Sequence, residues 1–268
     1  IEGIDRDKCI KCLECVRECP SVLFSKDDSG TIVFNDPNLW CISCGHCIAV
    51  CPEDAILFSD MGEEPSTFDE IGHPASLIGY ENLLKVFQSK RSVRRYKDEQ
   101  VALKDLKNIL EAIRYYASSS NMRSLKFRLI SDKETIMELS DAIIENLMEN
   151  PAMKSTYGDK ITQRRGQGRD PIFHGAPHVL IMSSGLEMNM EFLNAGVAGT
   201  YGMLAAQSLG VGSCWIGLAQ IAMNQQRKIR KLAGSRGTIK GVIVLGYPAV
   251  KYHATAPRPS LKVKGLDA

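Results

Sequence analysis

The chain has 268 residues, of which 44% are hydrophobic and 24% charged, so it can bury one large or two modest globular cores. Thirty-three basic residues nearly balance thirty-one acidic ones, and the formal net charge of +2 excludes the strongly basic surface of a nucleic-acid-binding protein. The sequence has neither a long apolar run nor a signal-peptide pattern, so we expect no membrane partner and no nucleic-acid partner.

Eight of the nine cysteines fall within the first 51 residues, and only Cys214 stands apart. A secreted disulfide scaffold would not leave most of the chain so poor in cysteine, so this distribution favours metal ligation in a reducing cytoplasm. The eight form two arrays of the pattern C-x2-C-x2-C-x3-C-P, and each position recurs 32 residues later, which predicts a pseudo-symmetric module. The arrays are Cys9, Cys12, Cys15 and Cys19, and then Cys41, Cys44, Cys47 and Cys51.

The spacing within each array predicts two 4Fe-4S clusters. Gaps of two residues let three thiolates of one tight loop reach three corners of a cube, and the fourth cysteine, which precedes a proline, ligates the other cluster. Zinc is the alternative, but zinc sites usually pair two CxxC units across a longer spacer. The expected ligand sets are therefore Cys9, Cys12, Cys15 and Cys51 for one cluster, and Cys41, Cys44, Cys47 and Cys19 for the other.

Residues 4–58 resemble bacterial two-cluster ferredoxins. The segments 22–24 and 55–58 are similar to the paired short strands that follow each array in that family. Leu13 stands where the first array often has Gly, whereas the second array keeps Gly45. We expect this difference to alter the amide hydrogen bonds around the first cluster, and with them its potential. His46 lies inside the second array, and we expect a solvated side chain there rather than a ligand.

A change of composition then divides the chain. Residues 61–80 carry glycines and prolines among acidic and small residues, which is typical of a surface linker. We therefore predict a two-cluster domain over residues 1–60, a linker over 61–80 and a second domain over 81–268.

Helices and strands alternate in the second domain. Apolar residues at helical spacing predict helices over 102–117, over 132–150 with Asp132 as the N-cap, and over 189–209. The last helix carries Gly196, Gly199 and Gly202 at every third position, which predicts close helix–helix contact, including contact between subunits. Strands are expected at 126–131, 178–183 and 241–246. The expected fold class is α+β, with a small ferredoxin-like domain followed by a larger, mostly helical domain around a central sheet.

Two polar segments of this domain are candidates for binding a ligand. Arg and Ser side chains within residues 90–96 supply donors suited to a dianionic phosphate, although a lone basic cluster is more often a solvated face. Residues 117–123 combine hydroxyls with an amide at the end of a predicted helix, and without the other segments they would read as a helix-ending loop.

Two further segments follow in the same domain. Residues 209–217 read L-G-V-G-S-C-W-I-G, and glycines there permit a close backbone approach to a flat cofactor. Cys214 within this segment is interpreted as a buried small side chain rather than a redox thiol. Near the end of the domain, Gly246-Tyr247-Pro248 is followed by Pro257-Arg258-Pro259.

Together, in this order, the four segments resemble the nitroreductase family, a dimeric FMN-binding α+β fold, over residues 83–262. The first is similar to its R-R-S-x-R stretch and the second to its P-S-x-x-N-x-Q-P-W stretch, with Arg123 in place of Gln. The third matches a turn whose backbone N–H meets flavin N5, and the fourth an arm that returns a basic residue to the FMN phosphate. The cofactor-binding residues that the resemblance implies are Lys90, Arg91, Ser92, Arg94, Ser118, Ser119, Asn121, Arg123, Ile216 or Gly217 as the N–H donor, and Arg258.

Residues 154–170 are basic and rich in glycine. In the fold that the resemblance implies, a mobile cover over the flavin lies here, which could select anionic substrates or contact a partner. A flexible solvated loop is the other interpretation. The basic residues of this region are Lys154, Lys160, Arg164, Arg165 and Arg169.

The resemblance implies a homodimeric, cytoplasmic FMN-dependent nitroreductase-type oxidoreductase. Electrons would pass from the two 4Fe-4S clusters, or from NAD(P)H, through FMN to a small electrophilic acceptor such as a nitroaromatic or a quinone. A ferredoxin or another redox protein could be the donor. One alternative is a non-catalytic electron-transfer subunit that docks other redox proteins, and another is reductive dehalogenation or flavin fragmentation. No catalytic side-chain acid or base is assigned.

Overall fold

The computed structural model describes residues 1–265, and the chain falls into two compact units. Unit 1 comprises Ile1–Gly79 together with the short segment Ser118–Arg123. Unit 2 comprises Tyr80–Ala117 and the chain from Ser124 onward. Each unit has a hydrophobic core of its own. Among the described residues, no helix combines the length and apolar character needed to cross a bilayer.

Unit 1 consists of two short hairpins and two short helices, α1 (Glu14–Glu18) and α2 (His46–Val50). Strand β1 (Gly3–Ile4) pairs antiparallel with β4 (Ile56–Leu57), and β2 (Phe24–Lys26) pairs antiparallel with β3 (Ile32–Phe34). A strand follows each array, as expected, although the first begins at Phe24 rather than at Val22, and the two strands do not pair with each other. Each instead pairs with a strand that precedes the opposite array, so the two halves of the repeat are interlocked.

The predicted linker, residues 61–80, contains two short, exposed helices rather than irregular chain. Helix α3 (Phe68–Ile71) begins with a capping box in which Thr67 and Glu70 exchange hydrogen bonds, and α4 (Pro74–Leu77) begins with a proline in its first turn. Helix α5 (Tyr80–Ser89) opens unit 2. Because α3 and α4 have only four residues each and bury none of them, the sequence carried no periodic signal for them.

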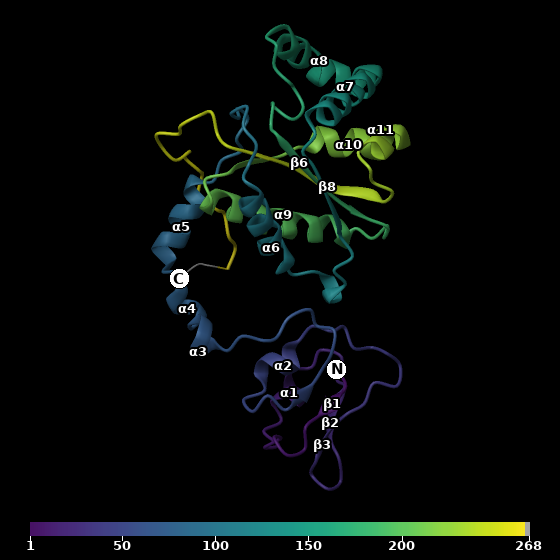
Figure 1. The fold of residues 1–268 in the computed structure, drawn as a ribbon, viewed down its shortest axis with the longest axis vertical. Helices are drawn as coiled ribbons and strands as arrows, with labels where there is room; N and C mark the ends of the chain where they lie inside the picture. Colours follow the sequence, from purple (N-terminus) through teal and green to yellow (C-terminus); the bar gives the residue numbers. More distant parts are fainter. Residues whose placement is uncertain (266–268) are drawn as a thin grey trace. The chain divides into compact units, whose positions relative to one another are not determined.

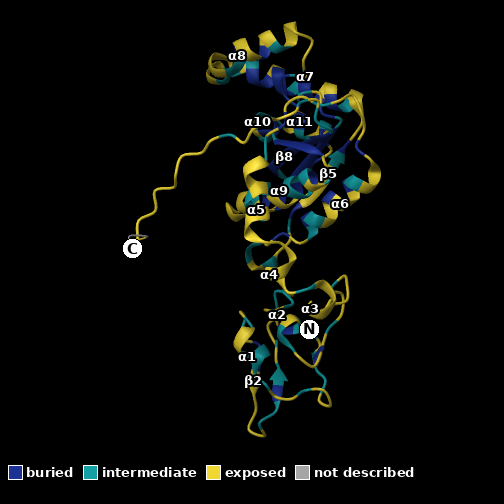
Figure 2. Ribbon diagram, turned by 90° about the vertical axis from the view of Figure 1, so that its left-hand side faces the viewer, coloured by how far each residue is buried: buried dark blue, intermediate teal, exposed yellow. Residues whose placement is uncertain are grey.

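The sheet of unit 2 has the order β5-β6-β8-β7, and all its pairs are antiparallel. Its strands are β5 (Lys126–Ile130), β6 (His178–Ser184), β7 (Gly212–Trp215) and β8 (Thr238–Gly246). The two central strands are buried almost throughout (Figure 2). Along β6, Val179 and Ile181 enter one core while Leu180 and Met182 enter the other, because side chains alternate across a strand.

Helices cover both faces of this sheet (Figure 1). One face packs against α6 (Leu103–Arg114) and α9 (Met190–Ser208). The other packs against α7 (Lys133–Glu149), α10 (Gly217–Gln225) and α11 (Arg227–Leu232). The expected helices and strands are confirmed to within a few residues at each end. The Asp132 carboxylate accepts a hydrogen bond from the Thr135 N–H at 2.7 Å, which confirms the predicted N-cap of α7.

Two glycines of α9 permit close packing within the chain itself. A Cβ at Gly199 would lie 2.6 Å from the Trp215 ring, and one at Gly202 would lie 2.7 Å from the Ile113 side chain on α6. A Cβ at Gly196 would meet nothing within 4 Å. The predicted close contact is therefore confirmed at Gly202, where α9 meets α6, and Gly199 makes room for a strand residue instead.

The interpretation of residues 154–170 as a loop is wrong. Most of this region belongs to a regular helix, α8 (Pro151–Gly166), which packs beside α7. Asn150 caps it, because its side-chain oxygen accepts from the Ala152 and Met153 N–H groups, and Pro151 occupies the first turn. This start signal outweighs the low helix propensity of Gly158, where an added Cβ would lie 3.4 Å from the Lys154 side chain and 3.7 Å from that of Met148.

Candidate functional site

The eight cysteines of unit 1 surround two small cavities. One cavity is lined by Cys9, Cys12, Cys15 and Cys51, and the other by Cys41, Cys44, Cys47 and Cys19. The fourth cysteine of each array thus lies beside the first three of the opposite array. The structure brings the cysteines together in the two crossed sets that the spacing predicts.

The backbone around the two sets repeats with the same interval of 32 residues as the sequence. The Cys19 sulfur accepts a hydrogen bond from the Leu23 N–H at 3.4 Å, and the Cys51 sulfur accepts one from the Ala55 N–H at 3.2 Å. Left-handed φ angles also recur in equivalent pairs, which are Lys11 and Ser43, Leu13 and Gly45, and Val22 and Asp54. These turns direct successive thiols toward one cavity, as ligation of a single cluster by one loop requires.

The thiols of each set also interact electrostatically. Burial, and then the nearby thiols of its own set, raise the pKa of the Cys47 thiol to about 11. Burial, together with its three set members, likewise raises the pKa of Cys15. Four thiolates gathered in such a place are unfavourable unless a cationic group binds them, and a metal deprotonates its thiol ligands outright. The donor sets therefore fit iron–sulfur clusters.

A single metal ion fits this arrangement less well. Within residues 1–265, no three His, Cys, Asp or Glu side chains lie close enough together to hold one ion. A 4Fe-4S cluster does not need such convergence, because it offers a separate iron atom to each of its four thiolates.

The segment Ser118–Arg123, which we expected to bind flavin, groups with unit 1 and contacts the second cysteine loop. The Asn121 side-chain N–H2 donates to the backbone carbonyls of Ile42 at 3.1 Å and of Ser43 at 2.8 Å. Its side-chain oxygen accepts from the Arg123 guanidinium at 3.2 Å. Ser120, Asn121 and Arg123 all have left-handed φ angles between 45° and 50°. Asn121 thus holds the peptide groups between Cys41 and Cys44.

Unit 2 contains a pocket of about 440 Å³, large enough for part of a flavin or a small aromatic substrate. Its walls come from α8, from the turn between Pro171 and His174, and from the end of β7 with the start of α10. Arg94 closes one side. The lining residues are Arg94, Tyr157, Lys160, Ile161, Gln163, Arg164, Pro171, Ile172, His174, Trp215, Ile216, Gly217 and Leu218.

The pocket distinguishes the two candidate backbone donors. The Ile216 N–H donates to the Val242 carbonyl at 2.8 Å and so continues the sheet. Gly217 is the first residue of α10, where a helix has no internal acceptor for its N–H. A Cβ at Gly217 would meet nothing within 4 Å, so the space beside it is open to a flat ring. These observations favour the Gly217 N–H as the donor to a flavin.

The basic segment after α5 is held against β7 and against the residue that follows β8. The Val93 N–H donates to the Ser213 carbonyl at 3.0 Å, and the Lys97 N–H donates to the Tyr247 carbonyl at 2.9 Å. The half-buried Lys90 ammonium donates to the Arg91 carbonyl at 2.9 Å, and burial lowers the pKa of Lys90. These backbone bonds fix the position of Arg94 at the pocket.

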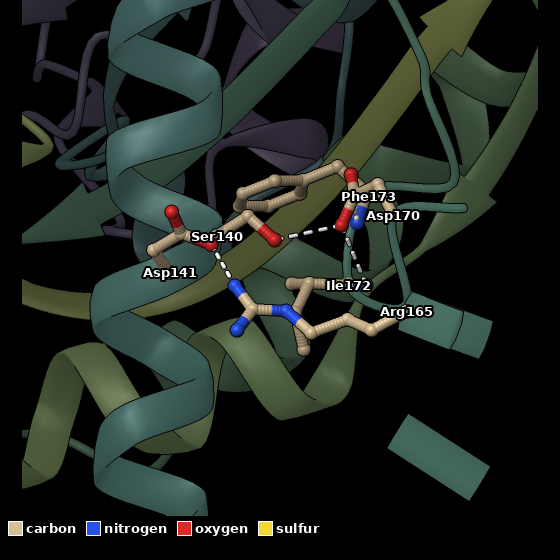
Figure 3. Close-up of polar contacts among 6 residues, drawn as sticks. All are labelled: Ser140, Asp141, Arg165, Asp170, Ile172 and Phe173. Atoms are coloured by element: carbon tan, nitrogen blue, oxygen red, sulfur yellow. Dashed lines mark hydrogen bonds and ion pairs between the residues drawn. The ribbon is translucent and has the colours of Figure 1, made fainter. Parts of the chain in front are cut away.

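Two polar clusters shape the wall that is formed by α8 and the turn leading to His174 (Figure 3). The Asp170 carboxylate accepts from the Ile172 and Phe173 N–H groups and from the Ser140 hydroxyl, which fixes the turn leading to His174. Arg165 forms an ion pair with Asp141 and thereby ties α8 to α7.

The structure brings only some of the expected flavin residues to this pocket. Arg94, Ile216 and Gly217 line it, and Lys90, Arg91 and Ser92 precede Arg94 in the same segment. Ser118, Ser119, Asn121 and Arg123 belong to unit 1, and Arg258 is exposed in the C-terminal arm. Their assignment to FMN stays a prediction.

Sequence reasoning did not single out other residues that line the pocket. Tyr157, Gln163 and His174 come from α8 and the turn after it, and no motif marks them. The basic character of α8 was the only available signal, and it did not indicate which of its cations face the pocket.

Comparisons with known proteins agree with this division. Residues 88–247 match the model of the nitroreductase family, and residues 8–56 match that of the 4Fe-4S dicluster domain. A protein of Archaeoglobus fulgidus named for NADH dehydrogenase or NAD(P)H nitroreductase activity is 26% identical over 173 residues, which cover 63% of this chain and 86% of the relative. A ferredoxin of Methanothermococcus thermolithotrophicus is 40% identical over 55 residues, which cover 20% of this chain and 88% of that protein.

Solved structures share the fold of unit 2. A nitroreductase with bound FMN from Bacteroides fragilis is 23% identical, with a TM-score of 0.57 over 69% of this chain and 97% of its own. One from Desulfitobacterium hafniense, also with bound FMN, is 22% identical, with a TM-score of 0.57 over 65% of this chain and 93% of its own.

Proposed function

The chain belongs to the nitroreductase family as an FMN-dependent oxidoreductase with a 4Fe-4S ferredoxin domain, and we propose that it passes electrons from two clusters through FMN to a small electrophilic acceptor. The acceptor class is a nitroaromatic or a quinone. Reducing equivalents enter at the clusters, from a ferredoxin or another redox protein, or at the flavin from NAD(P)H. Eight thiolate ligands suit a reducing compartment, so we place the protein in the cytoplasm.

The observation that carries this proposal is the pocket beside Gly217. It combines an open backbone approach, an N–H without an internal helix acceptor and a flanking basic segment. A bound FMN there would accept electrons singly or in pairs and deliver a hydride, which is chemistry that no side chain of the protein supplies. The protein's part is to bind and orient the ring and to limit the access of water.

Particular residues serve these roles. The Gly217 N–H would donate a hydrogen bond to a bound flavin, and the positive charge of Arg94 at the pocket would stabilise negative charge on the reduced ring. Trp215 and Ile216 line the pocket with apolar surface and exclude water. In unit 1, the two crossed sets of cysteines hold the clusters.

We also propose that the protein is a homodimer. Met190, Leu193, Val197 and Tyr201 lie at helical spacing along α9, and each exposes between 36% and 61% of its surface. Such an apolar stripe is a liability in a monomer and suits a subunit interface. Sedimentation equilibrium tests this: a dimer mass is expected, and substituting Leu193 and Val197 by Glu should yield monomers.

Anaerobic re-oxidation tests the main proposal. The purified protein, reduced by dithionite and freed of excess reductant, should be re-oxidised by a nitroaromatic or a quinone, followed by flavin and cluster absorbance. If reduced flavin persists with these acceptors while an oxidised ferredoxin removes its electrons rapidly, the protein is an electron-transfer subunit and the enzyme proposal fails.

A further inference from the structure

The charged side chains that line the pocket of unit 2 are all basic. Arg94, Lys160 and Arg164 line it, and none of its lining residues is acidic. A neutral aromatic acceptor gains little from three cations around the pocket. An anion gains from each of them, because charge-assisted hydrogen bonds are about twice as strong as neutral ones.

The five basic residues of the α8 region do not have the same surroundings. Lys160 and Arg164 face the pocket, whereas Arg165 is paired with Asp141 on α7. Lys154 and Arg169 do not line the pocket. Helix α8 therefore contributes two cations to the pocket wall. Neither has a carboxylate partner among the described ion pairs.

Arg164 is held in place rather than extended into solvent. Its guanidinium lies 3.3 Å from the His174 Nδ1 atom, and both side chains are partly buried. Burial, and then the Arg164 charge, lower the pKa of His174 to about 4, so the imidazole is neutral at pH 7 and its Nδ1 can accept from Arg164. His174 thus orients the guanidinium without neutralising it.

We propose that the physiological acceptor carries a carboxylate or a similar anionic group, and that Lys160 and Arg164 bind this group. The inference rests on the proposed function, since it names the substrate class of the same pocket. For a nitro acceptor the reaction balances as two electrons and two protons taken up by the nitro group, with loss of one water and formation of a nitroso group. The anionic group is unchanged, and it sets binding and orientation.

Binding of two unreactive probes to the oxidised holoprotein tests the proposal. Benzoate and benzamide differ in charge but hardly in shape, and calorimetry measures both dissociation constants. We expect benzoate to bind at least ~10-fold more tightly, a difference that one charge-assisted contact supports. Lys160→Gln should reduce this preference several-fold, and the double variant Lys160→Gln with Arg164→Gln should remove it. Lys154→Gln, a charge change on the same helix outside the pocket lining, should leave it unchanged.

The FMN phosphate is the other anion that these cations could hold, and flavin content distinguishes the two. If Lys160 and Arg164 bind the phosphate, the double variant loses FMN in proportion to its weakened binding, and the proposal is overturned. Equal binding of benzoate and benzamide to the wild-type protein also overturns it. Lys160 is exposed, so Lys160→Gln should fold normally and keeps the test valid if the double variant does not fold.

Turnover separates this inference from the proposed function. Reduced protein should react faster with 4-nitrobenzoate than with 4-nitrobenzamide at low concentration, with the difference residing in KM. Re-oxidation by neither compound, while benzoate still binds selectively, would contradict the proposed function and leave the anion site intact. Re-oxidation by both at equal KM would sustain the function and overturn the anion site.

Discussion

The two cysteine loops of unit 1 share a sequence pattern and a backbone, but their surroundings differ. Each loop has a left-handed residue before its short helix, Leu13 at φ 71° and Gly45 at φ 75°. In the second loop a side chain from a distant segment, Asn121, holds the peptide carbonyls between the first two cysteines, and the hydrogen bonds described for residues 1–265 give the first loop no counterpart. Cys47 is also buried, whereas its counterpart Cys15 is only partly so.

The residues that ligate a cluster are therefore not the ones that set its potential. The positions of the ligands follow from the repeat, so both loops can hold the same kind of cluster. Cluster potential depends on hydrogen bonding and solvent exposure, which are not repeated. We therefore expect two clusters of one type with different potentials.

Removal of a crossed cysteine should have the largest effect. Cys19→Ala takes a ligand from the cluster of the second loop, and Cys51→Ala takes one from the cluster of the first. Strand β2, which follows the first array, pairs with β3, which precedes the second, and β4 pairs with β1 in the same crossed way. Loss of one cluster should therefore also disturb the other. The wild-type protein should contain about eight iron atoms per chain, and each variant clearly fewer than about four, because both clusters are damaged. Iron and acid-labile sulfide analysis measures this.

Cys214 provides the matched control for these variants. It is buried in unit 2 among apolar side chains, as the sequence predicts, and Cys214→Ala should retain all the iron. A Cys19→Ala protein in which the cluster on the first loop is fully intact would contradict the interlocked unit.

Asn121 should account for an intermediate effect that is confined to the second loop. Asn121→Asp keeps the shape but removes both N–H donors and places a carboxylate against the Ile42 and Ser43 carbonyls. The lost bonds and the added repulsion should destabilise unit 1 by ~1–3 kcal/mol. The negative charge disfavours reduction, so the potential of that cluster should fall by on the order of tens of mV.

Redox titration followed by electron paramagnetic resonance measures both potentials in one sample. The cluster on the first loop serves as the internal control and should keep its potential. Equal shifts of both clusters would show that Asn121 acts on unit 1 as a whole rather than on one loop.

The smallest expected effect concerns the residue before each helix. Gly45→Ala should cost ~1 kcal/mol of unfolding free energy, because an L residue is strained at a positive φ. Steric crowding adds little, since the new Cβ would lie 3.6 Å from the Met61 methyl group, an ordinary contact.

Gly79→Ala is the matched control, because its φ is not left-handed and its Cβ would meet nothing within 4 Å. Thermal bleaching of the cluster absorbance reports unit 1 directly. If Gly79→Ala lowers the stability as much as Gly45→Ala does, the positive φ of Gly45 does not explain the loss. Leu13 in the first loop would then carry no strain relative to Gly45 in the second.

The sequence predicted the parts of the molecule that a local pattern encodes. The crossed cysteine sets follow from a spacing repeated after 32 residues, and the cap at Asp132 follows from a short polar side chain before an apolar helix. The strand pairing of unit 1 was not predictable, because strands of two or three residues carry no register signal. Helix α8 was missed because its glycines and charges masked the Asn150-Pro151 start.

The candidate flavin site shows the same limit. The sequence narrowed the backbone N–H donor to the flavin to two candidates, Ile216 and Gly217. The sheet bond from the Ile216 N–H to Val242 favours Gly217. It marked five basic residues, but only the packing of α8 shows that Lys160 and Arg164 line the pocket. The contact of Asn121 with Ile42 links residues 79 positions apart, which no local pattern encodes.

Re-oxidation of the reduced clusters with and without FMN tests electron transfer through the flavin most directly. Protein depleted of FMN, with its clusters intact and reduced, is mixed anaerobically with a nitroaromatic, and cluster absorbance is followed. We predict that the clusters stay reduced until FMN is added back and that they are then re-oxidised together with the appearance of nitroso product. Rapid cluster re-oxidation by the nitroaromatic without FMN would contradict electron transfer through the flavin.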